Sequence, residues 1–454
     1  MPRTIALKSV NLWLRKCNLW LNTNFVSESF LHYIWQFQYF DKSNLTTNAG
    51  ERLTVLKPGI LNSDAGPDFS QAKIKIDLIE WAGCVEIHIQ SSGWYEHKHD
   101  TDKAYENVVL HIVWEDNKPV YRTDGTPMPT FSLKGRVEEH LLKSYQKLIN
   151  DPASIPCSKS FRIVDEVVKH GMVDKALMSR LESRATQIKI QLDKNKGDWE
   201  ETTYQLLAAS FGFKVNKDPF IQLAQAMQYK LLQKHWNNVE QVEALLFGQA
   251  GFLVAKTKDE YLTRIFNEYQ FLAKKYDLEK KQMNVTQWKF LRLRPGNFPT
   301  VRLAQFAALL SSQKNIFSNL IESLSYKQLV QFFEIQQSTY WRNHYRFGKK
   351  SKTEVPALGA SSRENIIINT VVPLFVAYGQ SRDDWSFVDR AISILQSIPA
   401  EQNKITRLWE GLDYNSKTAF DSQGLIELYN NYCQRRACLN CTIGSSLLKP
   451  NRQV

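Results

Sequence analysis

The sequence predicts an α+β protein, in which a mixed core of residues 25–150 precedes an all-α region of residues 151–454. Apolar and polar residues alternate in the first part, as they do from Val85 to Gln90, and this period of two is typical of strands. In the second part apolar residues recur at steps of three and four, beginning with Leu177, Leu181 and Ala185. The period changes near Asn150-Asp151-Pro152, which we take as the domain boundary.

Length and composition are those of a globular protein with a polyanionic partner. The chain has 454 residues, 43% of them hydrophobic, and a formal net charge of +12, which suits a nucleic acid. Residues 1–24 form a basic extension that Arg15 and Lys16 interrupt, so we predict neither an export signal nor a membrane span. We therefore expect a cytoplasmic protein whose cysteines, including Cys17 and Cys84, are reduced or metal-bound.

The elements of the mixed core follow one another closely. Phe30, Ile34 and Phe37 share one helical face, and Ser27 is placed to cap that helix. We predict helices over residues 27–37 and 102–107, and strands over residues 52–56, 72–79, 84–90, 108–114 and 130–133. The order helix, three strands, helix, strand thus precedes a final short strand.

Polar side chains gather on one strand of this core. Because side chains alternate along a strand, Glu86, His88 and Gln90 lie on the same face. Asp68 precedes the neighbouring strand, so pairing of the two strands brings it near Glu86. Two carboxylates and an imidazole make a site for Mg²⁺ or Mn²⁺, in which Asp68 and Glu86 hold the metal.

Other polar residues near these strands have less clear roles. His97 and His99 are further candidates for the site, although an H-x-H pair is a weak metal signal and also suits a solvated loop. His111 could face the site, but we favour a satisfied histidine of the sheet. Glu28 could also reach the site, but we favour a solvated acid in the first turn of its helix.

These residues carry a resemblance to a known superfamily. Pro67-Asp68 followed by Glu86-x-His88 resembles the motif of the PD-(D/E)XK nucleases, and the predicted element order resembles their restriction-endonuclease-like αβββαβ core. The resemblance implies metal-dependent hydrolysis of phosphodiesters, with Asp68 and Glu86 as metal ligands. The superfamily usually has lysine where this chain has His88. The very-short-patch repair endonucleases of that superfamily also use histidine near this strand, and Trp94, His97 and His99 are similar to their Trp and His cluster.

Two stretches of the helical region combine arginine with aromatic residues. One contains Arg292, Arg294 and Arg302, and the other contains Arg342 and Arg346. Arginine pairs with phosphate and aromatic rings stack on bases, so we predict a nucleic-acid-binding role. The alternative is that the arginines lie in loops between helices while the rings fill the core.

Three cysteines lie close together near the C-terminus. Cys433, Cys438 and Cys441 have a C-x₄-C-x₂-C spacing that lets thiolates wrap one soft metal, and Cys157 is the expected fourth ligand. Zinc and an iron–sulfur cluster are both consistent with four thiolates, and a set of buried reduced cysteines is the alternative. Some nucleases of the superfamily carry such a cluster with one cysteine far from the other three.

The combined prediction is a metal-dependent nuclease that acts on DNA in preference to RNA. His88 would orient or deprotonate the attacking water, and Gln90 would steady the site. The alternative is a catalytically inactive protein that keeps a nuclease fold and binds nucleic acid or other proteins. From residue 25 to its end the chain also resembles a family of bacterial proteins of unknown function, a resemblance that implies no activity.

Overall fold

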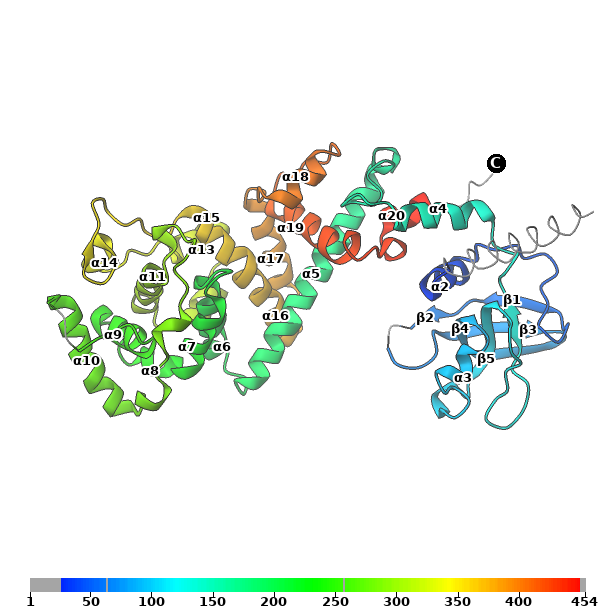
Figure 1. The fold of residues 1–454 in the computed structure, drawn as a ribbon, viewed down its shortest axis with the longest axis horizontal. Coiled ribbons are helices and arrows are strands. Elements are labelled where there is room, and N and C mark those ends of the chain that lie inside the picture. Colours follow the sequence, from blue (N-terminus) through cyan, green and yellow to red (C-terminus); the bar gives the residue numbers. More distant parts are fainter. Residues whose placement is uncertain (1–25, 63, 256–257, 450–454) are drawn as a thin grey trace, which may run out of the picture. The chain divides into compact units, whose positions relative to one another are not determined.

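The computed structural model describes residues 26–62, 64–255 and 258–449, and the chain divides into two compact units (Figure 1). The first unit contains Met1–Met172 and Tyr429–Val454, and the second contains Val173–Leu428. The division therefore lies after the predicted boundary near residue 150, and the C-terminal segment returns to the first unit. The predicted extension of residues 1–24, with Cys17, lies outside the described residues.

A curled mixed sheet forms the centre of the first unit, with strand order β1-β3-β4-β5-β6 and with β2 also paired to β3. The first pairings are antiparallel, and β4–β5 and β5–β6 are parallel. The strands are β1 (Leu53–Lys57), β2 (Ile60–Leu61), β3 (Phe69–Ile76), β4 (Ile79–Gln90), β5 (Val108–Glu115) and β6 (Thr130–Ser132). The parallel β4–β5 pair requires a crossover, and residues 91–107 supply it.

Helix α2 (Glu28–Phe37) packs on this sheet through its apolar face, which is buried. Phe30, Ile34 and Trp35 are each 0% exposed, whereas Phe37 is 48% exposed and does not join the buried face. The Ser27 side chain accepts a hydrogen bond from the Phe30 amide, as predicted for an N-cap.

The crossover between β4 and β5 differs from the single helix predicted for residues 102–107. It contains a short helix, α3 (Gly93–Glu96), and a 3₁₀ turn, η1 (Lys103–Tyr105). Lys98 has a left-handed backbone with φ 62°, which ends the first helical segment, and Asp102 caps the second by accepting from the Ala104 amide. The parallel strands are therefore joined mainly by loop, and this loop carries His97 and His99.

The remaining elements of the first unit are short and lie near the chain's two ends. They are α4 (Glu139–Ile149), η2 (Phe161–Ile163), η8 (Cys438–Asn440) and α20 (Thr442–Leu447). Helix α5 (Glu166–Lys194) and the π-helical turn η7 (Leu428–Cys433) contain the two points of division. Tyr145 of α4 stacks on Phe30 of α2, with ring centroids 4.7 Å apart.

The second unit is helical apart from one hairpin, within its described residues. A single apolar core includes Tyr204, Phe306 and Trp341, each 0% exposed. The helices are α6 (Trp199–Phe211), α7 (Lys217–Ala226), α8 (Tyr229–Gln233), α9 (Val239–Gln249), α10 (Glu260–Tyr276), α11 (Pro299–Ser312), α12 (Ile316–Glu322), α13 (Tyr326–Phe332), α14 (Thr339–Asn343), α15 (Ala360–Ile366), α16 (Val372–Arg382), α17 (Ser386–Ser397), α18 (Lys404–Glu410) and α19 (Ala419–Glu427). The 3₁₀ turns η3 (Glu279–Lys281), η4 (Val285–Gln287) and η5 (Pro295–Asn297), the π-helical turn η6 (Ile367–Val371) and the β7 (His344–Arg346)–β8 (Lys349–Lys350) hairpin complete it.

The predicted fold class is confirmed at the level of a mixed α+β protein with a small sheet near the N-terminus and a large helical region. Among the described residues, no helix has the length and apolar character needed to cross a membrane.

Candidate metal and active site

Asp68 and Glu86 are adjacent because the ends of β3 and β4 pair in register. The Glu86 carboxylate accepts a hydrogen bond from the Asp68 amide (3.0 Å), and the Asp68 carboxylate accepts one from the Ile87 amide (2.9 Å). Glu86 is 5% exposed, while Asp68 is half-buried. The Glu86 carboxylate is thus held by the backbone just before β3, and the Asp68 carboxylate is held by the backbone of β4. The two acids converge as the sequence predicts.

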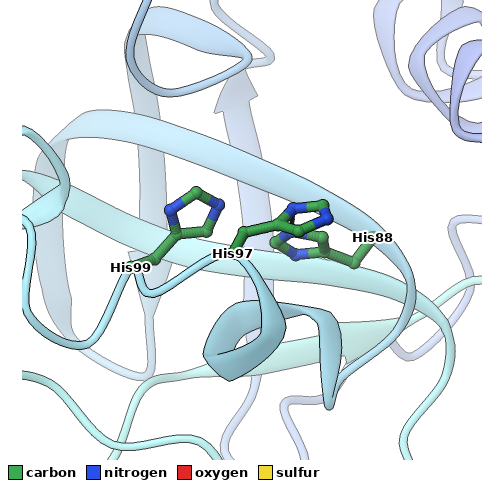
Figure 2. A group of neighbouring side chains, drawn as sticks. All are labelled: His88, His97 and His99. Atoms are coloured by element: carbon green, nitrogen blue, oxygen red, sulfur yellow. Dashed lines mark hydrogen bonds between the residues drawn. The ribbon is translucent and has the colours of Figure 1, made fainter.

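Three histidines, His88, His97 and His99, lie close together (Figure 2), and two of them contact the Glu86 carboxyl group. His88 follows on β4, and His97 and His99 come from the loop after α3. His88 Nε2 lies 3.1 Å from His97 Nδ1 and 3.8 Å from Glu86 Oε1. His99 Nε2 lies 3.2 Å from the same Glu86 oxygen. The three imidazoles each offer one nitrogen, and these nitrogens lie within 4.8 Å of one another.

His111 extends this cluster into the sheet. Its Nε2 is 2.8 Å from His88 Nδ1, so both ring nitrogens of His88 face another imidazole. His111 is 0% exposed on β5, which pairs with β4 at Glu86–His111. His111 thus contacts the site residue His88 and its Nδ1 has no hydrogen-bond partner among the described residues, so the favoured expectation of a satisfied sheet histidine is not met.

Burial and neighbouring charges set the protonation of this cluster. Burial, followed by the charges of Asp68 and Glu28, raises the pKa of Glu86 to about 8. Burial also lowers the pKa of His88 to about 3, with a further contribution from the neighbouring histidines. The pKa of His111 falls to about 3 for the same reasons. At neutral pH these pKa values leave His88 and His111 uncharged and keep much of the Glu86 carboxyl group protonated.

Helix α2 places two residues near the site: His32, which was not singled out from the sequence, and Glu28, for which a solvated position was favoured. His32 Nε2 lies 3.2 Å from the Asp68 carboxylate. Glu28, four residues earlier, is half-buried rather than solvated, and its charge contributes to the raised pKa of Glu86. Residues four apart share one face of a helix, so the spacing of Glu28 and His32 is the sequence feature that could have indicated that both face the site.

Close packing fixes the His88 ring. A Cβ atom placed on Gly93, the first residue of α3, would lie 2.7 Å from His88 Cδ2. On the other side of the cluster, Tyr105 stacks on His99 with ring centroids 3.7 Å apart, and Trp94 is 1% exposed. Only a residue without a side chain allows α3 to approach β4 this closely.

A cavity of about 410 Å³ lies beside the cluster and gives it an opening to solvent. His99, Tyr105 and Arg122 are among its lining residues. Arg122 was not singled out from the sequence, because it lies in a loop after β5 without a recognisable motif. It places a guanidinium at the wall of the cavity.

The donor set fits a transition-metal ion better than Mg²⁺. Three imidazoles surround a common space and the Glu86 carboxyl group contacts two of them, and imidazole ligands suit Zn²⁺ and similar ions whereas Mg²⁺ prefers oxygen. Among the described residues, Nδ1 of His99 and Nδ1 of His111 are buried without a hydrogen-bond partner, and His99 Nε2 has no partner other than its 3.2 Å approach to Glu86. Buried polar atoms of this kind require a ligand, an ion or water.

Gln90 is the predicted site residue that lies apart from the cluster. It is exposed at the end of β4, and its Nε2 lies 3.5 Å from a Glu115 carboxylate oxygen. The strand period correctly placed Gln90 on the face of His88, but the strand extends beyond the cavity at this point.

In the second unit the two arginine-aromatic stretches contact each other. The Arg346 guanidinium lies 4.5 Å from the ring centroids of both Phe290 and Phe298. Arg292 and Arg294 are exposed in the first stretch, and Lys349 and Lys350 are exposed in the second.

Arg302 and Arg342 have different surroundings. Arg302 is 6% exposed, and its guanidinium donates to Gln305, Asn297 and Ser362. Arg342 is half-buried and donates to Thr339. Trp341 is 0% exposed, so this part of the second stretch fills the core as the alternative interpretation proposed.

A family model described as protein of unknown function (DUF2851) matches residues 28–404. The match includes the sheet, the histidine cluster and most of the helical unit, and it ends before Cys433. No curated protein and no solved structure matches the chain. The likeness to the PD-(D/E)XK nucleases therefore stays a prediction.

Proposed function

We propose that this chain, which belongs to the DUF2851 family of proteins of unknown function, is a metal-dependent nuclease whose active site is the Asp68–Glu86–histidine cluster. The observation that carries the proposal is the buried Glu86 carboxyl group, which contacts His88 and His99, accepts from the Asp68 amide, and has no lysine or arginine partner among the described residues. A divalent metal bound there would displace the proton that burial holds on this group. The superfamily resemblance, in which these two acids hold a metal, also supports the proposal, although β2 adds a strand to the expected order and the crossover before β5 is mainly loop.

The metal would be held by Glu86 with His88, His97 and His99, and Asp68 with His32 lies next to them. Such an ion polarises a phosphodiester and lowers the pKa of a water bound to it. The raised pKa of Glu86 means that the carboxyl group releases its proton when the ion binds, so metal affinity falls as pH is lowered.

His88 acts as a ligand in this proposal and not as the general base. A general base works best when its pKa lies near the working pH, and a pKa of about 3 makes His88 a poor proton acceptor. The same low pKa keeps its nitrogen lone pair free for a metal. Asp68, half-buried and adjacent to Glu86, is the residue that we assign to orienting the water.

Cationic side chains in both units suit a phosphate backbone. Arg122 lines the cavity beside the cluster and can pair with a phosphate there. In the second unit, Arg292, Arg294 and Arg346 are exposed, and we assign them to backbone contacts that are independent of sequence. The buried Arg302 is not part of that surface. DNA is our first choice of substrate, and RNA is the second.

The experiment compares cleavage by the full chain with that by matched variants. Supercoiled DNA, single-stranded DNA and RNA are incubated with Mn²⁺, Zn²⁺ or Mg²⁺ in turn. We expect cleavage with Mn²⁺ or Zn²⁺, and loss of it in Glu86→Gln and Asp68→Asn, which keep side-chain shape and remove charge. Glu139→Gln is the control, because Glu139 is an exposed carboxylate on α4 of the same unit.

The outcomes separate the nuclease from the binding protein. Cleavage that Glu86→Gln retains at the wild-type rate would place the activity elsewhere and refute the assignment. Binding of DNA without cleavage under every metal would favour the inactive, binding-only protein. Substituting lysine at position 88 tests the likeness to the superfamily, and activity retained in His88→Lys would support that likeness and overturn the assignment of His88 as a metal ligand.

A further inference from the structure

Four buried cysteines of the first unit come from two distant parts of the chain. Cys157 lies in the loop between α4 and α5, directly after the buried Pro156. Cys433, Cys438 and Cys441 lie in the turns that precede α20. The four are between 6% and 9% exposed, and all are free of disulfide bonds.

Specific contacts hold these two segments together. Arg436, between Cys433 and Cys438, donates to the carbonyls of Asp151 (2.8 Å) and Ala153 (3.0 Å), which lie in the Cys157 loop. The Arg436 backbone is left-handed, with φ 53°. Residues other than glycine rarely adopt this conformation, so the turn between the cysteines has a defined geometry. The C-terminal segment is thereby fastened to the loop that carries Cys157.

The thiols also lie within electrostatic reach of one another. Burial, together with the charges of Cys441 and Cys438, raises the pKa of Cys157 to about 12. The pKa of Cys433 is raised by burial and by Cys157, Cys441 and Cys438 in that order. Buried thiols can pack as small apolar groups, whereas a metal ion bound among them would deprotonate them and draw them together as ligands.

The spread of the sulfur atoms distinguishes between metals. A single tetrahedral zinc, with Zn–S bonds of about 2.3 Å, needs sulfurs about 3.8 Å apart. Among the described residues, the ligand atoms that come within 4.8 Å of one another in a group of three are those of the histidine cluster, and the thiols do not meet that distance. A single zinc would therefore require the thiols to move closer together, whereas the ligands of a cluster of several metal ions lie farther apart than those of one ion.

We propose that Cys157, Cys433, Cys438 and Cys441 are the four thiolate ligands of a structural metal centre, and that this centre is an iron–sulfur cluster. It joins the chain segments before and after the second unit, so it closes the polypeptide across that whole unit. This centre is independent of the nuclease proposal, because no ligand of the histidine cluster is shared with it.

The test uses the full chain prepared without air. We expect about two or four iron atoms and as many acid-labile sulfides per chain, with a broad visible absorbance. Cys157→Ser and Cys438→Ser should lose the iron, while Cys84→Ser, which removes a half-buried cysteine of β4, should keep it. If the serine variants do not fold, the test uses wild-type protein alone. Iron and sulfide in the purified protein, with a loss of thermal stability when a chelator removes the iron, would then support the proposal.

Each alternative result has a defined meaning. One zinc per chain that Cys157→Ser loses and His88→Ala keeps would support the four-thiolate centre and overturn the choice of iron–sulfur. Wild-type metal content in Cys157→Ser would overturn the four-ligand assignment. Absence of iron and zinc, with no rise in melting temperature after reconstitution with either, would overturn the proposal as a whole.

Discussion

Replacing Gly93 with alanine perturbs the histidine cluster without removing any of its chemical groups. The added methyl would lie 2.7 Å from Cδ2 and 3.0 Å from Cγ of His88, closer than nonbonded carbon atoms approach. His88 cannot simply turn aside, because its two ring nitrogens contact His111 at 2.8 Å and His97 at 3.1 Å. Either α3 moves away from β4 or the His88 ring leaves these partners.

Both responses cost free energy. Adding a methyl to a closely packed site typically destabilises the folded state by about 1–3 kcal/mol. For a protein unit of this size, a loss of about 2 kcal/mol lowers the melting temperature by roughly 4–8 °C. The displaced His88 nitrogen should also weaken metal binding and any cleavage, since a metal site depends on ligand position.

The measurement is thermal unfolding and Mn²⁺ titration of Gly93→Ala beside a matched control, Gly171→Ala. Gly171 lies in α5 in the same unit, and a Cβ there would have no neighbour within 4 Å. The control should gain up to about 1 kcal/mol, because alanine favours a helix over glycine. If Gly93→Ala were as stable as the control and bound Mn²⁺ like wild type, the packing described around His88 would be wrong.

Three further predictions concern the second unit. Burial raises the pKa of Glu243 to about 7 from an ordinary 4.5. The stability that this carboxyl group contributes is therefore fully present below pH 4.5 and falls by about 3 kcal/mol as the pH rises from 4.5 through 7. Glu243→Gln should lose this pH dependence when its urea unfolding is measured at pH 4.5 and 7.5. The same change in unfolding free energy between these two pH values in wild type and in Glu243→Gln would contradict this. Arg346→Ala should reduce the slope of log affinity for DNA against log salt by about 1, whereas Arg382→Ala, another exposed arginine over a ring, should leave it unchanged. Asn403 accepts from the amides of Ile405 and Thr406, so Asn403→Ala should cost about 1 kcal/mol, and no loss would show that the cap is unimportant.

The local pattern of the sequence predicted most strands of the core, but the run predicted over residues 72–79 crosses the turn at Asp77 and Leu78 between β3 and β4, and β2 was not predicted. Alternation placed Glu86 and His88 on one face of β4, and pairing of β3 with β4 brought Asp68 to Glu86, as the spacing indicated. These features depend on neighbours along the chain and on a hairpin, so a single sequence contains the information. The apolar period of α2 likewise predicted its buried face, apart from Phe37.

Residues that meet through tertiary packing were harder to place. His32 reaches Asp68 because α2 crosses the sheet, and Arg122 reaches the cavity from a loop after β5. The role of Gly93 depends on a 2.7 Å approach to His88 that no spacing rule contains. The burial of Arg302 against Asn297 and Gln305 could not be distinguished from exposure, because an arginine between aromatic residues suits both settings.

The central claim, that Glu86 and the three histidines bind a divalent metal, is tested most directly by anomalous diffraction from a crystal grown with Mn²⁺. We predict one strong anomalous peak within coordination distance of Glu86 Oε1 and of at least two of the nitrogens of His88, His97 and His99, and its loss in a Glu86→Gln crystal. A well-ordered cluster without a peak, or a peak that persists in Glu86→Gln, would contradict the claim.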